Sequence, residues 1–334
     1  DRFAQFLRKL LDDTKDPERP VRLLAHSMGG LVARSLVYRH SRLWDELMAR
    51  DGARFIMLGT PNQGAHSMVE ALIGKSDTLR SLARLDLAND LQTILDIIGE
   101  FRGALQLLPK PGFADAGGAQ FDDYFTVERW IEFKEEMKDF WFGDKVTAVP
   151  TADALSAGKW LWDRDGLTPA LPGAHQDKTI YVHGCAPLTA CGIKKVEKDW
   201  KMVGTAEGDG TVTWASGAVA GIGRRYYMPA AHGDLANSDE YFGALVELLR
   251  AGATSALMDR PPAARAAKML GPITYQAGAP RYPMPEEAAH PLMGRSKRKR
   301  LKTRRAVTLK VRVKAMDLRF VAVPIMVGHY EQDP

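Results

Sequence analysis

A pentapeptide near the start of the chain, Ala25-His26-Ser27-Met28-Gly29, has the residue types needed to expose and activate a serine hydroxyl. It is a variant of G-x-S-x-G, in which small residues flank a serine on a sharp turn from a strand into a helix. Alanine replaces the first glycine here, and it is still small. We predict that Ser27 is a nucleophile and that the backbone N–H of Met28 donates to an oxyanion.

A serine nucleophile needs a base to take its proton and an acid to orient that base. Asp209 lies between two glycines, and His232 lies between an apolar run and the last helical segment. The order serine, aspartate, histidine is an established one for such a triad, so we predict Asp209 as the acid and His232 as the base. Two alternatives remain: Gly-Asp-Gly is also a common turn, and Asp234 is a rival acid very close to the base in sequence.

The other histidines close to these motifs have simpler interpretations. We expect the side chain of His26 to pack under the turn. His66 and His183 lie near predicted strand ends, and we expect structural roles for both, although either could touch substrate. No cluster of histidine, aspartate and glutamate has metal-ligand spacing, and no phosphate-binding glycine loop is present. The predicted reaction therefore needs no cofactor and no metal.

The elements that would position the triad are apolar runs separated by helical patterns. Such runs are typical of a parallel sheet with both faces covered by helices. Strands are predicted at 21–25, 54–61, 179–185 and, more weakly, 224–229, and helices at 2–14, 31–40 and 238–250. The turn at Ser27 then joins the first strand to the helix after it. The pattern predicts an α/β fold.

Between the second and third predicted strands lies a long segment without strand patterns. Apolar residues at helical spacing predict an amphipathic helix over 91–108, and residues 121–142 contain 8 of the 28 aromatic residues. We expect residues 67–178 to form a helical cap in which Trp141 and Phe142 contact substrate. The alternative is an ordinary insertion that packs its aromatic residues against itself.

Four motifs in order, AHSMGGLVAR, LGTPNQGAHS, GDGTV and AAHGDL, resemble those of lipase-type α/β-hydrolases. The resemblance covers about residues 1–250 and is greatest to the lecithin:cholesterol acyltransferase-like and GPI inositol-deacylase-like branch. It implies the α/β-hydrolase fold, with the acid in GDGTV and the base in the loop before the last helix. In such proteins a second oxyanion donor follows an earlier strand. The chain opens without Met and close to the turn at Ser27, so we expect it to be N-terminally truncated and to lack the first strands.

Composition changes after about residue 258 and predicts three parts. We expect a hydrolase domain over 1–258, a Pro/Ala-rich and then basic linker over 259–305, and the start of a second, β-containing domain over 306–334. Residues 295–305 hold 8 of the 46 basic residues, so the rest has 38 against 41 acidic residues. Because the excess of positive charge sits in that run, nucleic acid is not an expected partner.

Two cysteines, Cys185 and Cys191, are too few for a disulfide framework. We expect two reduced thiols in a cytoplasmic protein, with a local disulfide as the alternative. No apolar run is long enough for a transmembrane helix. The expected function is hydrolysis of apolar or lipid-like esters through an acyl-enzyme, with peripheral contact between the cap and a membrane as a further expectation. An acyltransferase with the same triad and a non-catalytic module of a multidomain protein are the alternatives.

Overall fold

The structure is a computed structural model that describes residues 1–14, 16, 19–86, 89–118, 123–137, 148–163, 167, 170–197, 199–262 and 272–275. All of these belong to the first of two compact units, Asp1–Arg281. The predicted second domain at 306–334, most of the predicted linker, and Trp141 and Phe142 lie outside the described residues.

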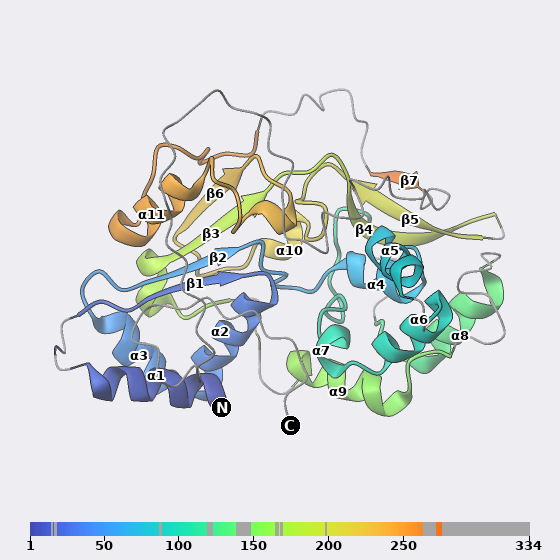
Figure 1. Ribbon diagram of the computed structural model, residues 1–334, viewed down its shortest axis with the longest axis horizontal. Coiled ribbons are helices and arrows are strands. Elements are labelled where there is room, and N and C mark those ends of the chain that lie inside the picture. The colour runs from blue at the N-terminus through green and yellow to red at the C-terminus, as the bar shows by residue number, and fades with distance from the viewer. Residues whose placement is uncertain are drawn as a thin grey trace. The chain divides into compact units, whose positions relative to one another are not determined.

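A four-stranded parallel sheet forms the centre of this unit (Figure 1). Its order is β1-β2-β3-β6, and the register places Ala25 beside Met57 and Met57 beside Tyr181. All four predicted strands are confirmed, with these bounds: β1 Arg22–His26, β2 Arg54–Leu58, β3 Thr179–Gly184 and β6 Arg224–Met228. Since the strands are parallel, their carboxyl ends meet at one edge, where the loops that carry Ser27 and His232 begin.

Helices cover both faces of the sheet, as continuous apolar strands require. Along β2, Phe55 and Met57 pack against the helices on one face, and Ile56 and Leu58 pack against the helix on the other. These helices are α1 Arg2–Asp13, α2 Met28–Arg39 and α3 Ser41–Ala49 on the first face and α11 Phe242–Ala251 on the second. In Figure 1 the helices α1, α2 and α3 lie beside β1 and β2, and α11 lies beside β6. The fold is therefore of the predicted class, α/β with a parallel sheet flanked by helices.

The described part of the segment between β2 and β3 contains helices joined by turns and loops. The helix expected over 91–108 is wrong as a single element, because it is interrupted at Glu100 and Phe101. The helices are α4 His66–Leu72, α5 Asp77–Leu85, α6 Leu91–Gly99, α7 Arg102–Leu105, α8 Val127–Glu136 and α9 Ala152–Asp163. Whether this segment caps the site stays a prediction.

A second, antiparallel sheet follows β3, and the sequence patterns did not predict it. It has the order β4-β5-β7, with β4 at Thr189–Val196, β5 at Asp199–Thr205 and β7 at Ile273–Tyr275. Ile193 and Met202 of this sheet are buried against the helices that follow β2. The linker prediction is therefore wrong for 273–275, because those residues pair with β5 as a strand.

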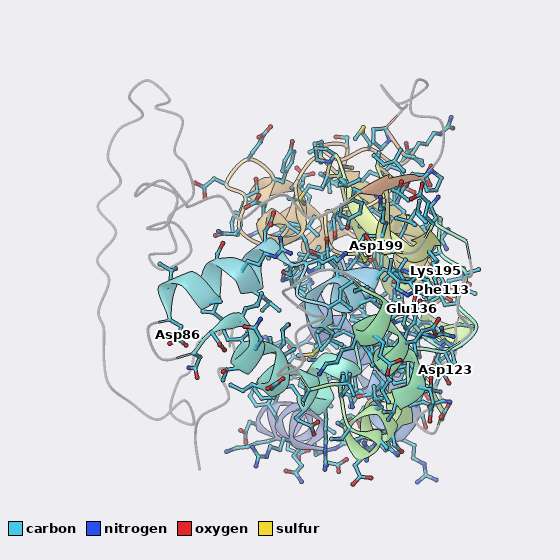
Figure 2. The ribbon with its side chains drawn as sticks, turned by 90° about the vertical axis from the view of Figure 1, so that its right-hand side faces the viewer. Asp86, Phe113, Asp123, Glu136, Lys195 and Asp199 are labelled. Atoms are coloured by element: carbon cyan, nitrogen blue, oxygen red, sulfur yellow. The ribbon has the colours of Figure 1, made fainter. Side chains whose placement is uncertain are left out.

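The described aromatic residues of 121–142 are part of this second core. Trp130 and Phe133 are fully buried, and the indole N–H of Trp130 donates to the backbone oxygen of Tyr124 at 2.9 Å. Across the surface of this core, Glu136 of α8 and Lys195 of β4 form an ion pair at 2.6 Å (Figure 2). For these residues the structure favours the ordinary insertion that packs its aromatic side chains against itself.

Three shorter helices complete the described chain: η1 Gly173–Lys178, α10 Trp214–Gly217 and η2 His232–Asp234. The last two flank β6, and η2 carries the predicted base. Among the described residues, no helix has both the length and the apolar character to cross a membrane.

Candidate active site

Ser27 lies on a strained turn between β1 and α2. Its φ and ψ are 54° and −129°, in a region that a residue with a side chain adopts only at a cost of about 1–3 kcal/mol. The turn is held by the Ser27 N–H, which donates to the Leu58 oxygen at 2.8 Å, and by the Gly30 N–H, which donates to the Ser27 oxygen at 3.0 Å. Gly30 allows the close approach of Thr60, whose Oγ1 would lie 2.0 Å from a Cβ at position 30. These contacts hold Ser27 in its strained conformation at the carboxyl edge of the sheet.

The structure brings the three predicted triad residues together. Ser27 Oγ lies 2.9 Å from His232 Nε2, and His232 Nδ1 lies 2.9 Å from Asp209 Oδ2. In the tautomer that satisfies both contacts, Nδ1–H donates to the carboxylate and Nε2 accepts from the serine hydroxyl. A serine hydroxyl, an acceptor nitrogen and a carboxylate in this order can move a proton away from the serine oxygen.

Asp209 is held by its own loop after β5. The side chain is buried, and its Oδ1 accepts from the backbone N–H groups of Thr211 at 2.9 Å and Val212 at 2.7 Å. Gly210 has φ of 95°, a conformation that favours glycine, and its N–H donates to Thr189 Oγ1 at 2.9 Å. Because Oδ1 is occupied by the loop, Oδ2 is directed to His232. The rival acid, Asp234, makes no such contact with Nδ1 in the described structure.

Backbone contacts hold His232 at the start of η2. Its N–H donates to the Asp209 backbone oxygen at 2.8 Å, and its own oxygen lies 2.8 Å from His26 Nε2. Gly59, the residue after β2, lies against the contact between Asp209 and His232, and its φ is 55°. A Cβ at this position would lie 2.7 Å from Asp209 Oδ2 and 3.0 Å from His232 Nδ1. Gly59 and the contact from His26 were missed from the sequence, where the only signal for Gly59 was its place after a buried strand.

Met28, the predicted oxyanion donor, is the first residue of α2. The first N–H groups of a helix have no partner within the helix and point to its N-terminal end. That end also carries a partial positive charge, which stabilises an anion. The position of Met28 therefore fits an oxyanion donor next to the Ser27 hydroxyl.

The two histidines expected to be structural are buried away from the Ser27–His232 contact. His66 Nδ1 lies 3.0 Å from Asp115 Oδ2, and both side chains are buried. His183 stacks on Tyr227 with ring centroids 4.8 Å apart. Burial lowers the pKa of His183 to about 3, so its ring is neutral at physiological pH. These contacts agree with packing roles for both rings.

Cys185 and Cys191 are free, so the local disulfide is wrong. Burial raises the pKa of Cys185 to about 11 and that of Cys191 to about 12. A protonated thiol is a poor nucleophile and a poor metal ligand. In the described part of the chain, no group of three or more His, Cys, Asp or Glu residues could hold a metal ion.

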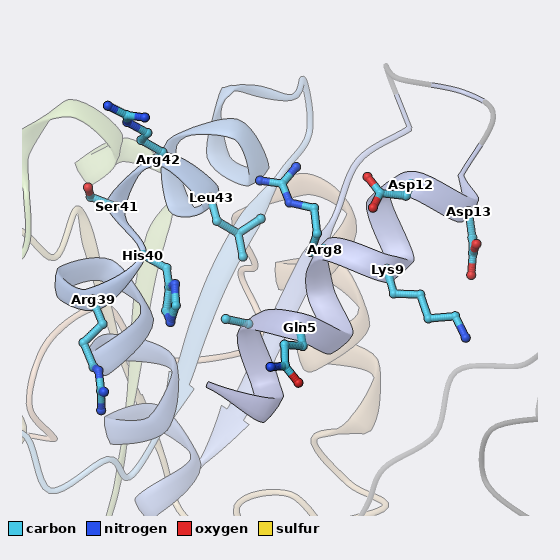
Figure 3. Close-up of a pocket in the computed structure, with 11 residues that line it drawn as sticks. Gln5, Arg8, Lys9, Asp12, Asp13, Arg39, His40, Ser41, Arg42 and Leu43 are labelled. Atoms are coloured by element: carbon cyan, nitrogen blue, oxygen red, sulfur yellow. The ribbon is translucent and has the colours of Figure 1, made fainter.

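A hollow of about 820 Å³ lies between α1 and the turn from α2 to α3 (Figure 3). Its walls are charged and include Arg8 and Lys9 from α1 and His40 and Arg42 from the turn. None of the residues that line it belongs to the triad. Arg8 is already paired with Glu46 at 2.8 Å. This hollow is therefore separate from the candidate active site.

The sequence and the structure were compared with known proteins. No protein family model and no curated protein matches the sequence. Among solved structures, a chain of the Tle4–Tli4 complex has a TM-score of 0.38 at 16% identity, covering 64% of this chain and 53% of that one. The Bacillus licheniformis lipase BlEst2 has a TM-score of 0.34 at 14% identity in its propeptide form, covering 78% of this chain and 41% of that one. Its mature form has a TM-score of 0.29 at 16% identity, covering 74% and 71%.

This chain thus spans about half the length of the first of these chains and less of the second. The chemistry of the site follows from its own geometry.

Proposed function

We propose that this chain is a serine ester hydrolase that works through an acyl-enzyme on Ser27. The proposal depends on one observation, the continuous series of contacts from Ser27 Oγ through the His232 ring to Asp209, with both distances at 2.9 Å. Each atom in the series has the acceptor or donor character that general-base catalysis requires. The strained backbone of Ser27 supports the same proposal, since strain of this kind is concentrated at functional sites.

In the first half of the reaction, His232 Nε2 takes the proton of the Ser27 hydroxyl while Oγ attacks the ester carbonyl carbon. The electrons of the carbonyl bond move to its oxygen, which accepts a hydrogen bond from the Met28 N–H. His232 then gives its proton to the alkoxide leaving group, the C–O bond breaks, and the alcohol departs. Ser27 is left as an ester of the acyl group.

In the second half, water takes the place of the alcohol. His232 removes a proton from water, the hydroxide attacks the acyl carbon, and the proton returns to Ser27 Oγ as the acid is released. Asp209 does not change protonation state. Its Oδ2 keeps the proton of His232 on Nδ1 and stabilises the positive charge that the ring carries in each half of the reaction.

The substrate class is also a proposal: esters of apolar acyl groups. The Met28 side chain, next to the nucleophile, is apolar and 45% exposed. Apolar side chains exposed beside a serine offer contacts to an acyl chain. The same proposal has three further parts. Trp141 and Phe142 contact the substrate, and the segment 67–178 contacts a membrane. The protein is located in the cytoplasm.

Steady-state hydrolysis of p-nitrophenyl esters of two to twelve carbons tests both proposals at once. Ser27→Ala should abolish turnover, whereas Ser35→Ala, a matched control about two helical turns further along the chain in α2, should keep it. Because one methylene in an apolar pocket changes binding by about 1 kcal/mol, kcat/KM should rise with chain length. Equal turnover by the Ser27→Ala variant would refute the hydrolase, and a flat series would refute the apolar substrate. With an added alcohol, an ester product would instead identify an acyltransferase.

A further inference from the structure

His26 contacts the residue that supplies the base. It is the last residue of β1 and the immediate neighbour of Ser27. Its Nε2 lies 2.8 Å from the backbone oxygen of His232, and the centroids of the two rings are 4.9 Å apart. A carbonyl oxygen only accepts, so the His26 Nε2 must carry a hydrogen and donate it. His26 therefore does more than fill space under the turn.

We propose that His26 is a positioning residue for His232, which it holds by the backbone so that the His232 ring stays in line with Ser27 and Asp209. This inference rests on the proposed function, because it assigns a role within the same site. His26 does not touch the reacting atoms and acts only through His232.

The contacts of His232 explain why this hold matters. Asp209 contacts two of its atoms: the backbone oxygen of Asp209 accepts from the His232 N–H at 2.8 Å, and Oδ2 lies 2.9 Å from Nδ1. Ser27 contacts Nε2 and His26 contacts the backbone oxygen, at 2.9 and 2.8 Å. The backbone N–H of Leu235 also donates to the His232 oxygen, but at 3.4 Å this hydrogen bond is weaker than the one from His26. Two consecutive residues of the strained turn thus hold His232 at opposite ends.

The charge state of His26 fits this role. The titratable groups that face its ring are His232 and Asp209. Burial, and then the neighbouring His232, lower the pKa of His26 below its usual value of 6.5. The ring is consequently neutral at physiological pH, and the single N–H of a neutral ring can lie on Nε2, where the His232 oxygen accepts it. A neutral neighbour also avoids repulsion when the His232 ring becomes positively charged during the reaction.

Two substitutions separate the hydrogen bond from the packing. His26→Gln places an amide N–H close to where Nε2 lies, and His26→Leu has similar bulk without a donor. A misplacement of about 1 Å costs on the order of 100-fold in rate, so we expect His26→Leu to lower kcat by about 10- to 100-fold with KM nearly unchanged. His26→Gln should recover most of that loss. His40→Gln, at a partly exposed histidine after α2 whose ring contacts Asp1, is the control that should change neither constant.

A double variant tests whether His26 acts through His232. In the His232→Ala background, His26→Leu should bring no further loss in the rate at which a fluorophosphonate labels Ser27. A multiplicative loss would show that His26 acts on the fold and would overturn the proposal. Equal kcat for the parent and His26→Leu, or an equal fall for His26→Gln and His26→Leu, would also overturn it. If the His26→Leu variant does not fold, His26→Asn takes its place in the experiment. The asparagine amide is too short to reach the His232 oxygen, so we expect the same fall in kcat as for His26→Leu.

A measurement independent of activity separates this inference from the proposed function. Nitrogen NMR of the whole chain labelled with ¹⁵N-histidine reports which ring nitrogen of His26 carries the hydrogen, and His26→Gln assigns its signals. We expect the Nε2–H form with a hydrogen-bonded proton at pH 7. The Nδ1–H form would overturn the role of His26 even if the chain hydrolyses esters. Inactivity of the parent would instead refute the proposed hydrolase.

Discussion

Replacing Gly59 with alanine adds one methyl group at the point where the acid and the base meet. The Cβ would lie 2.7 Å from Asp209 Oδ2, 2.8 Å from Leu235 Cδ1 and 3.0 Å from His232 Nδ1. Ordinary contacts of a Cβ begin at 3.4 Å, so the carboxylate and the ring must each move by several tenths of an ångström. Leu235 can rotate away, but Asp209 is held by its own loop. We therefore expect the substitution to distort the contact between Asp209 and His232.

The magnitude follows from the size of that displacement. A misplacement of about 1 Å costs on the order of 100-fold in rate, so we expect kcat for a p-nitrophenyl ester to fall by about 10- to 100-fold. Alanine also strains the backbone at φ of 55°, at a cost of about 1–2 kcal/mol in stability. Gly112→Ala separates the two effects, because Gly112 has φ of 74° and no atom within 4 Å of its Cβ position.

Both variants should lose stability in urea unfolding, Gly59→Ala the more because of its close contacts, and only Gly59→Ala should lose activity. The assay measures kcat and KM at a fixed temperature at which both variants are folded. Equal kcat for Gly59→Ala and Gly112→Ala would refute the reasoning, since the methyl group would then not affect the catalytic contacts.

Two further predictions concern groups outside the triad. Burial raises the pKa of Glu70 from its ordinary value of 4.5 to about 6, and Tyr275 of β7 donates to its Oε1 at 2.9 Å. A carboxyl whose pKa is higher in the folded state binds more protons there than in the unfolded state. Glu70 therefore stabilises the fold below about pH 4.5, and this contribution, up to about 2 kcal/mol, is lost as the pH rises to about 6. Glu70→Gln should remove this part of the pH dependence of urea unfolding, and an unchanged dependence would contradict the prediction. The raised pKa values of the Cys185 and Cys191 thiols predict slow reaction with DTNB at pH 8 in the folded chain and fast reaction in urea; two fast thiols in the folded chain would contradict this.

The sequence was sufficient to predict the elements whose residues form continuous patterns. Of the four parallel strands, β2 and β3 are largely buried apolar runs, and the order and loop positions of Ser27, Asp209 and His232 among the predicted strands predicted their meeting. These features are local, because strand burial and turn chemistry leave their mark on neighbouring residues.

The features that were missed depend on contacts between distant segments. The strand β7 has three residues and exists through pairing with β5, about seventy residues earlier in the chain. The need for glycine at position 59 arises from side chains of Asp209 and His232, and the role of His26 from a backbone oxygen that lies 206 residues away. The break between α6 and α7 differs, because it has a local signal that was missed: Gly99 is the last residue of α6.

The most direct test of the central claim is where a fluorophosphonate binds covalently to the chain. Intact mass followed by peptide mapping measures the adduct and locates the modified residue. The proposed mechanism predicts a single adduct on Ser27, formed quickly in the parent and lost in Ser27→Ala, and slowed by several orders of magnitude in His232→Ala because no base then takes the serine proton. An adduct on another residue, or labelling of Ser27 at the same rate without His232, would contradict it.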